Sequence, residues 1–174
     1  MMEQSIREIL LPDPGATEKL GAALAKAMLP GLVVYLEGDL GAGKTTLVRA
    51  LLHAMGHQGT VKSPTYALVE LYVISGLYFY HFDFYRFTSP EEFFDAGLDE
   101  YFRQDAVCLV EWQEKAAGCL PPADARLCLS IPAGASAETS RAVAFCASNE
   151  KGKRCLTQCF AAWDAGISAL ESPD

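Results

Sequence analysis

The stretch that decides the fold runs from Leu32 to Thr45 and reads LVVYLEGDLGAGKT. Its first five residues, Leu32 to Leu36, form a continuous apolar run of the kind that is buried on both faces in a parallel sheet. Residues 38–45 match the phosphate-loop pattern Gly-x-x-x-x-Gly-Lys-Thr, and a helix is predicted from Lys44 to Met55. A buried strand, a Gly-rich loop and a helix start, in this order, predict an α/β fold with a phosphate site.

The Gly-rich loop supplies the chemistry of that site. Its glycines let successive backbone N–H groups turn toward a phosphate, and the helix N-terminus adds partial positive charge. We expect Lys44 to reach the β- and γ-phosphate oxygens and Thr45 to offer a hydroxyl to Mg²⁺. The predicted nucleotide-binding residues of the loop are Gly38, Asp39, Leu40, Gly41, Ala42, Gly43, Lys44, Thr45 and Thr46.

A magnesium nucleotide also needs a carboxylate on a neighbouring strand. Asp83 follows the apolar run 78–82, and Glu111 follows the run 107–110. Because ligands collect at the carboxyl ends of parallel strands, both acids are candidates for the metal and for catalysis beside Lys44. Each also fits a surface acid at a strand end. Thr65, in the loop Ser63-Pro64-Thr65, stands where nucleotide switches often place a hydroxyl that senses γ-phosphate.

Other polar residues near these acids allow two interpretations each. His81, Asp83 and Tyr85 alternate along the chain and therefore share one face of their strand. His81 fits a hydrogen-bonded structural histidine better than an acid or base. Arg86 fits either an arginine finger or a surface ion pair. His53 and His57, four residues apart, lack the third ligand that a metal site would need.

The remaining patterns predict further elements of the fold. Residues 17–28 should form a helix with Thr17 as its N-cap, and Ser89 should cap a short helix that stops at Gly97. Residues 69–74 and 77–84 should form a hairpin around Ser75-Gly76. Strands are expected over 107–110, 127–131 and 143–145, and a last amphipathic helix over 156–170. With 174 residues, 1–174 should be a single domain.

Composition limits the partners and the compartment. The formal net charge is −8, so the field of the whole molecule repels nucleic-acid backbones, and direct nucleic-acid binding is not expected. No run of 18 apolar residues and no signal peptide are visible, which predicts a cytoplasmic protein without a membrane segment. The six cysteines contain no Cys-x-x-Cys pair and are expected to be reduced apolar side chains.

Four motifs together resemble one family. GDLGAGKTT (38–46), VKSPTY (61–66), YHFDFYR (80–86) and EW (111–112) resemble, in order and spacing, the bacterial TsaE family of ATPases in tRNA threonylcarbamoyladenosine biosynthesis. The likeness runs from about Thr17 to Pro121, and the residues after Asp124 match only in general character. A phosphate loop alone is shared by many families, whereas its combination with the other three motifs is specific.

The resemblance implies a three-layer α/β/α P-loop NTPase fold with a mixed, largely parallel sheet. It implies ATP and Mg²⁺ as cofactors and TsaD and TsaB as protein partners in the modification of adenosine 37. It assigns Lys44 to phosphate binding, Thr45 and Glu111 to magnesium, Asp83 to the outer shell of the metal or the attacking water, and Thr65 to a switch loop. Trp112 corresponds to a tryptophan beside the nucleotide, although core packing would also explain it.

Three functions are therefore weighed. The first is ATP hydrolysis that drives a TsaD/TsaB complex, with slow turnover by the protein alone. The second is a small-molecule P-loop kinase, which would need an arginine-rich lid that the sequence does not contain. The third is a switch that binds ATP and signals without productive hydrolysis.

Overall fold

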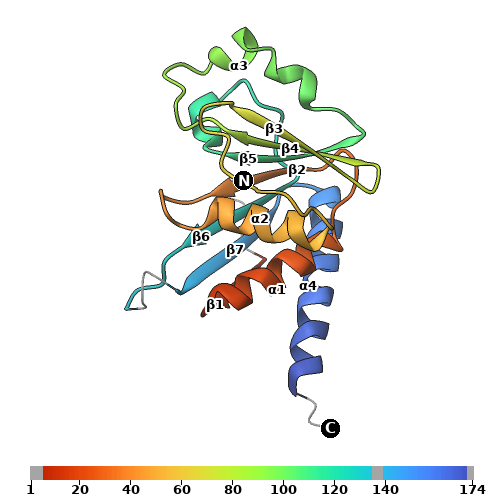
Figure 1. Ribbon diagram of the computed structural model, residues 1–174. Coiled ribbons are helices and arrows are strands. Elements are labelled where there is room, and N and C mark those ends of the chain that lie inside the picture. Colours follow the sequence, from red (N-terminus) through yellow and green to blue (C-terminus); the bar gives the residue numbers. More distant parts are fainter. Residues whose placement is uncertain (1–5, 135–138, 172–174) are drawn as a thin grey trace.

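The computed structural model describes residues 6–134 and 139–171, and its centre is a seven-stranded sheet with the order β1-β7-β6-β2-β5-β4-β3 (Figure 1). The strands and helices have the following bounds: β1 Arg7–Leu11, α1 Pro14–Ala25, β2 Val33–Glu37, α2 Lys44–Ala54, β3 Val69–Ile74, β4 Leu77–Asp83, α3 Glu92–Asp95, β5 Ala106–Glu111, β6 Ala125–Ser130, β7 Arg141–Ala147 and α4 Glu150–Glu171. Two 3-10 helices, η1 Leu98–Tyr101 and η2 Gln113–Ala116, flank β5 in the sequence.

Four adjacent strands run parallel in the middle of this sheet. β2 pairs in parallel with β5 on one side and β6 on the other, and β4 pairs in parallel with β5. The pairs β1–β7, β6–β7 and β3–β4 are antiparallel. The sheet is therefore mixed, with its parallel strands buried at the centre, as the apolar runs 32–36 and 107–110 predict.

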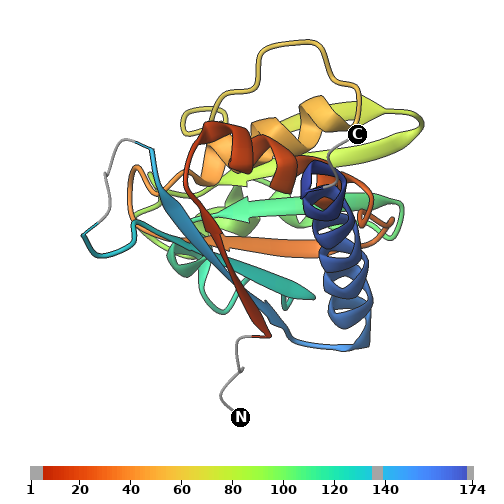
Figure 2. The ribbon, with the colours of Figure 1, turned by 90° about the horizontal axis from the view of Figure 1, so that it is seen from below.

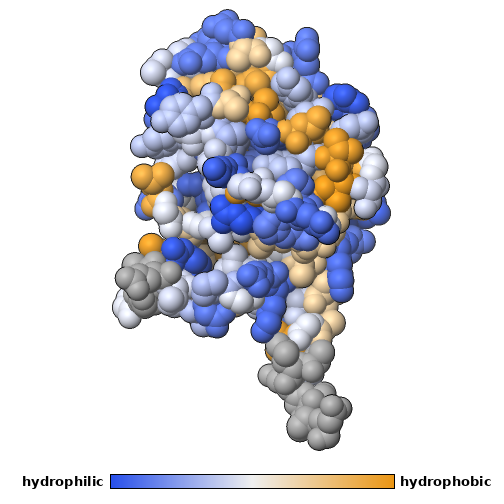
Figure 3. All heavy atoms as spheres, in the orientation of Figure 1, coloured by the Kyte–Doolittle hydropathy of each residue, from blue (hydrophilic) through white to orange (hydrophobic). Residues whose placement is uncertain are grey.

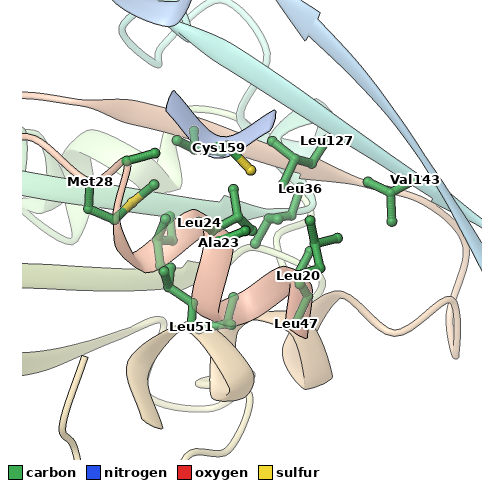
Figure 4. Packing of buried hydrophobic residues seen from close by; sticks show 14 of the residues in the cluster. Leu20, Ala23, Leu24, Met28, Leu36, Leu47, Leu51, Leu127, Val143 and Cys159 are labelled. Carbon is green, nitrogen blue, oxygen red and sulfur yellow. The ribbon is translucent and has the colours of Figure 1, made fainter. Parts of the chain in front are cut away.

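Helices α1, α2 and α4 cover one face of the sheet (Figures 1 and 2). Leu20 and Leu24 of α1 meet Leu47 and Leu51 of α2 beneath the β2 side chain of Leu36, and all five are at most 3% exposed (Figure 4). Burial of a leucine side chain contributes roughly 1.5–3 kcal/mol, so this layer is a main source of the fold's stability.

The opposite face carries a smaller, aromatic layer. Phe82, Phe84 and Phe93 are fully buried there, with Phe82 stacked on Phe102 at a centroid distance of 4.9 Å. The elements above this face are short, namely α3, η1 and η2 (Figure 1). The predicted three-layer α/β/α architecture is confirmed, with aromatic side chains rather than long helices filling most of the third layer.

Hydrophobic side chains also gather on the surface of the β3–β4 hairpin (Figure 3). Leu71 and Val73 of the edge strand β3 are 46% and 57% exposed, while Tyr72 and Ile74, which alternate with them, are buried. The period of two therefore places one side of β3 against α2 and leaves the other partly open.

Asp124 connects the C-terminal helix to the central sheet. This buried carboxylate accepts hydrogen bonds from the Val33 backbone N–H (2.8 Å) and from Asn149 Nδ2 (2.8 Å), and it lies 3.3 Å from the Lys151 ammonium. Gly152 packs directly on the Asp124 carbonyl. The start of α4 is therefore fixed at the amino ends of β2 and β6.

Several sequence predictions need correction. Thr17 is not an N-cap, because α1 begins earlier and the Asp13 carboxylate accepts the Ala16 N–H at 2.8 Å. The last helix begins at Glu150 rather than Leu156, since Asn149 accepts the Gly152 N–H. The strand β1 was not predicted. Its alternation of buried Ile9 and Leu11 with exposed Leu10 is a strand signal that is only five residues long.

The cysteines are free thiols, and Cys108, Cys155 and Cys159 are buried. Burial raises the pKa of each of these three thiols to about 12, as expected for reduced apolar side chains. Within the described residues no helix combines the length and the apolar character needed to cross a bilayer.

The close contact at Gly152 yields a stability prediction with a control in the same helix. A Cβ at position 152 would lie 1.8 Å from the Asp124 carbonyl oxygen, so Gly152→Ala should lower the free energy of unfolding by about 2–4 kcal/mol. A Cβ at Gly166 would meet nothing within 4 Å, so Gly166→Ala should be neutral or stabilising by up to about 1 kcal/mol. Urea unfolding measures both; equal stabilities would contradict the packing.

Candidate phosphate site

A cavity of about 260 Å³ opens at the carboxyl ends of β2, β4 and β5. Residues from the Gly-rich loop, the loop after α2, the two strand ends and β7 surround it. They are Asp39, Leu40, Gly41, Ala42, Gly43, Lys44, Thr45, Thr46, Ser63, Thr65, Asp83, Tyr85, Glu111, Trp112 and Arg141. The structure thus brings together every predicted site residue except Gly38, which lies at the base of the loop and lines a neighbouring cavity.

Two glycines of the loop are needed for its shape. Gly38 has φ of 138° and packs so closely on β6 that a Cβ would lie 2.4 Å from the Leu129 carbonyl oxygen. Gly43 has φ of 102° and forms the N-cap of α2. Both angles lie in the region that side chains with a Cβ rarely adopt, so the pattern Gly38-x-x-x-x-Gly43 has a direct geometric cause.

Lys44 is folded back on its own loop. Its ammonium donates to the carbonyl oxygens of Gly38 and Asp39 and lies 4.0 Å from the ring centroid of Trp112. Burial lowers the pKa of Lys44, partly offset by nearby carboxylates, the largest contribution coming from Glu111. An anionic phosphate that approached the ammonium would favour its charged form, so this position suits a polyphosphate ligand.

Glu111 is the centre of a buried hydrogen-bond group. Its Oε1 accepts from the Thr45 hydroxyl at 2.8 Å and lies 2.8 Å from His81 Nε2. An ionised carboxylate can only accept, so His81 Nε2 carries the proton in this pair. The side chain of His81 is fully buried and Glu111 is 3% exposed, which agrees with a structural histidine that holds the acid in place.

Asp83 lies beside Glu111 in the parallel register and collects a different set of donors. Ser63 and Thr65 donate their hydroxyls to Oδ2, and the Tyr85 backbone N–H donates to Oδ1 at 2.9 Å. The loop after α2 is therefore tied to the end of β4. Ser63, which the sequence analysis quoted only as part of its motif, contacts the acid as directly as Thr65 does.

Trp112 and Arg86 take different places around the site. Trp112 is half-buried with φ of 60°, and its ring lies between Lys44 and Tyr85, so it is neither pure core nor free surface. The Arg86 guanidinium stacks on the exposed ring of Tyr66 at 3.9 Å and does not line the cavity. The structure therefore gives no support to Arg86 as an arginine finger.

His53 and His57 form no metal site in this structure. Their rings stack with centroids 6.2 Å apart, and His53 Nε2 lies 3.1 Å from the Gly59 carbonyl oxygen. No group of three or more His, Cys, Asp or Glu side chains suited to a metal occurs among the described residues. The oxygen ligands at the cavity are thus the better candidates for a cation.

Two features of the site have no signal in the sequence. Arg141, the first residue of β7, donates to loop carbonyls almost 100 positions away. Glu37 accepts from Gln113 (3.0 Å) and Arg126 (2.7 Å) at the edge of a second cavity of about 620 Å³, which shares Asp39 and Trp112 with the first. Only the sheet order brings these residues together, so spacing along the chain could not reveal them.

The arrangement suits a magnesium nucleotide. Mg²⁺ prefers oxygen ligands, and the Thr45 hydroxyl and the Glu111 carboxylate already lie within 2.8 Å of each other at the start of α2. The helix N-terminus favours anions, and Lys44 adds a full positive charge. Fold and site together define a protein of the P-loop NTPase class.

Comparison with known proteins gives the family. The model of the family "Threonylcarbamoyl adenosine biosynthesis protein TsaE" matches residues 11–143. The chain belongs to the TsaE family. This confirms the resemblance drawn from the four motifs and extends it beyond residue 121, to the start of β7.

Individual relatives agree with this result. The chain is 50% identical to the tRNA threonylcarbamoyladenosine biosynthesis protein TsaE of Haemophilus influenzae over 119 residues, which is 66% of this chain and 75% of that protein. It is 37% identical to the TsaE protein of Treponema pallidum over 70% of this chain and 90% of the relative. The crystal structure of YdiB from Bacillus subtilis superposes with a TM-score of 0.73 at 29% identity, covering 92% and 97% of the two chains.

The pairing of His81 with Glu111 yields a stability prediction. His81→Phe removes a donor from a buried carboxylate and should lower the free energy of unfolding by about 1–3 kcal/mol. His81→Gln keeps an N–H that can reach Glu111 and should lose less. Urea denaturation of the three proteins tests this, and a Phe variant as stable as the wild type would show that the pair contributes nothing to stability.

Proposed function

We propose that this protein binds and hydrolyses Mg-ATP, and that hydrolysis drives the cycle of a TsaD/TsaB complex that makes threonylcarbamoyladenosine at position 37 of tRNA. The observation that carries the proposal is the convergence of Lys44, Thr45, Asp83 and Glu111 on one cavity at the carboxyl edge of the parallel strands. Membership of the TsaE family supports the tRNA pathway. TsaD and TsaB as partners, and ATP over GTP, rest on the resemblance.

The loop and Lys44 would hold the phosphate chain. Its backbone N–H groups and the N-terminus of α2 favour the β-phosphate, and Lys44 would leave the carbonyls of Gly38 and Asp39 to contact the phosphate oxygens. Exchanging carbonyl dipoles for phosphate charges strengthens the hydrogen bonds of the ammonium. The lysine therefore has more favourable partners with nucleotide bound than without it.

Thr45 and Glu111 would hold the magnesium ion, which neutralises charge that develops on the phosphate oxygens during transfer to water. Because Glu111 Oε1 already accepts from the Thr45 hydroxyl and from His81, the orientation of the carboxylate is fixed. His81 is in this account a support for Glu111 and does not meet the nucleotide.

Asp83 would orient the attacking water or the outer shell of the metal. Its two oxygens accept from Ser63, Thr65 and the Tyr85 N–H, so its side chain has little rotational freedom. A carboxylate fixed in this way can accept a proton from water without a large movement. Ser63 and Thr65 also couple the loop after α2 to the chemistry at Asp83.

Exposed apolar and aromatic side chains at the mouth of the cavity support a protein partner. Leu40 (75% exposed) and Tyr85 (45%) line the cavity, and Tyr66 (81%) directly follows the lining residue Thr65 in the chain. A partner that covered them would also exclude water from the phosphates, which fits slow turnover by the protein alone. The net charge of −8 favours a protein rather than tRNA as that direct contact.

ADP production tests the proposal. The purified protein with Mg-ATP should release ADP slowly, and addition of TsaD and TsaB should accelerate multiple turnovers. Lys44→Ala should lower the accelerated rate by at least about a hundredfold, because it removes a charge aimed at the phosphates. Lys26→Ala, which removes an exposed lysine at the end of α1, is the matched control and should leave the rate unchanged.

Other outcomes would favour one of the two alternative functions or contradict the link to TsaD and TsaB. Tight Mg-ATP binding without ADP release, even with both partners present, would identify a non-hydrolysing switch. Transfer of phosphate to a small molecule from a metabolite mixture would identify a kinase. Vigorous hydrolysis by the isolated protein that TsaD and TsaB do not change would remove the link to the partner complex.

A further inference from the structure

Arg141 reaches the phosphate loop from a distant part of the chain. Because β7 runs antiparallel to β6, its first residue lies at the edge of the sheet where the parallel strands end. From there Arg141 Nε donates to the Ala42 carbonyl at 3.0 Å and its Nη2 donates to the Gly41 carbonyl at 3.2 Å. One planar guanidinium thus contacts two successive peptide groups of the loop.

The arginine is itself anchored. Its Nη1 donates to the Ser140 carbonyl at 2.8 Å, and the Ser140 hydroxyl donates to the Pro12 carbonyl at 3.2 Å, next to the start of α1. The stem of Arg141 also packs on Gly43, where a Cβ would lie 3.5 Å from Nε. The guanidinium is therefore held between β7 and the outer side of the loop.

Contacts to these carbonyls set the direction of the loop's N–H groups. In a trans peptide the C=O and N–H bonds lie in the peptide plane and point in opposite directions. Holding the Ala42 carbonyl on the Arg141 side therefore turns the Gly43 N–H to the other side of the loop. The Gly41 carbonyl is held in the same way, and the N–H of that peptide, from Ala42, donates to the Asp39 carbonyl at 3.0 Å and closes the turn of the loop. Glycine-rich backbone has many alternative conformations, so such a brace would reduce the entropy lost when phosphate binds.

The charge of Arg141 is also suited to the cavity. The ionisable residues around it comprise the acids Asp39, Asp83 and Glu111 and the bases Lys44 and Arg141. A polyphosphate entering beside three carboxylates needs cationic neighbours, and Arg141 is the second of the two basic side chains among the described lining residues.

We propose that Arg141 is a positioning residue for phosphate binding, which braces the peptide groups of residues 41–43 so that the Gly43 N–H is preorganised for a nucleotide's phosphates. The inference rests on the proposed function, because it assumes that this loop binds a nucleotide. It adds a residue that lies outside the four motifs. Since the brace acts on the loop and not on the terminal phosphate, it should affect ATP and ADP equally.

Calorimetric titration of the full chain with Mg-ATP and Mg-ADP tests the brace. Arg141→Ala should raise both dissociation constants by about tenfold or more, the effect expected for losing charge-assisted hydrogen bonds. Arg141→Lys keeps the charge but not the two-pronged geometry, so it should also bind both nucleotides more weakly. Arg103→Ala is the matched control, since Arg103 pairs with Asp105 on the exposed surface before the start of β5, at the end of that strand opposite to the cavity.

Chemical rescue separates a brace from a general effect on folding. Guanidinium chloride, at concentrations well below those that unfold the protein, should restore nucleotide affinity to Arg141→Ala, while sodium chloride at the same concentration should not. Thermal unfolding of the variant without nucleotide establishes that it is folded.

Each contrary result overturns the inference. Wild-type affinity in Arg141→Ala would show that the loop needs no brace, and wild-type affinity in Arg141→Lys would show that charge alone suffices. Loss of affinity for ATP but not for ADP would assign Arg141 to the terminal phosphate, and a folded Arg141→Ala that guanidinium does not rescue would exclude a local brace. Failure of the wild type to bind either nucleotide would instead overturn the proposed function, and this inference with it.

Discussion

The parallel pairing of β2, β5 and β4 is the constraint on which the site depends. It places Leu36 opposite Glu111 and Glu111 opposite Asp83, so the ends of three strands reach the same edge of the sheet. The Gly-rich loop starts one residue after β2 ends, and α2 therefore begins directly in front of both acids. Buried apolar side chains on both faces of these strands fix the register, and a slip by one residue would turn Glu111 to the other face of the sheet, away from Thr45 and His81.

The same pairing brings two buried carboxylates close together, and the surrounding hydrogen-bond donors stabilise them. Two carboxylates that are 2% and 3% exposed lie on adjacent strands, where like charges repel and desolvation is costly. Each is compensated by its own donors: Thr45 and His81 at Glu111, and Ser63, Thr65 and the Tyr85 N–H at Asp83. The residues of the SPT and H-x-D motifs thus have a physical purpose in this structure before any ligand is considered.

Sequence reasoning succeeded where a signal is local. Gly38, Gly43 and Lys44 carry fixed spacing within eight residues, and the runs before Asp83 and Glu111 predict strand ends, so the grouping of Lys44, Asp83 and Glu111 around one cavity could be predicted from the chain alone. Features that depend on contacts between distant parts of the chain could not be predicted from the sequence. Arg141, Glu37 and Asp124 act on segments that are far away in the sequence, and neither periodicity nor capping rules report such contacts. The start of α1 was predicted too late because the side chains of Asp13 and Thr17 can both cap a helix. In the structure Asp13 is the N-cap and Thr17 lies buried within the helix.

The position of β1 at the edge of the sheet affects the order in which the sheet forms while the chain is synthesised. It pairs with β7, and Arg7 further forms an ion pair with Asp164 of α4 (2.7 Å), 157 residues later in the sequence. At ribosomal rates the first strand would wait on the order of 10 s before its partners have been synthesised. The side of the sheet formed by β1, β7 and β6 therefore completes last. By then the strands that carry the phosphate loop and both acids have been synthesised. Such long-range pairings slow folding, and they leave the backbone N–H and C=O groups of β1 without their strand partner until β7 has been synthesised.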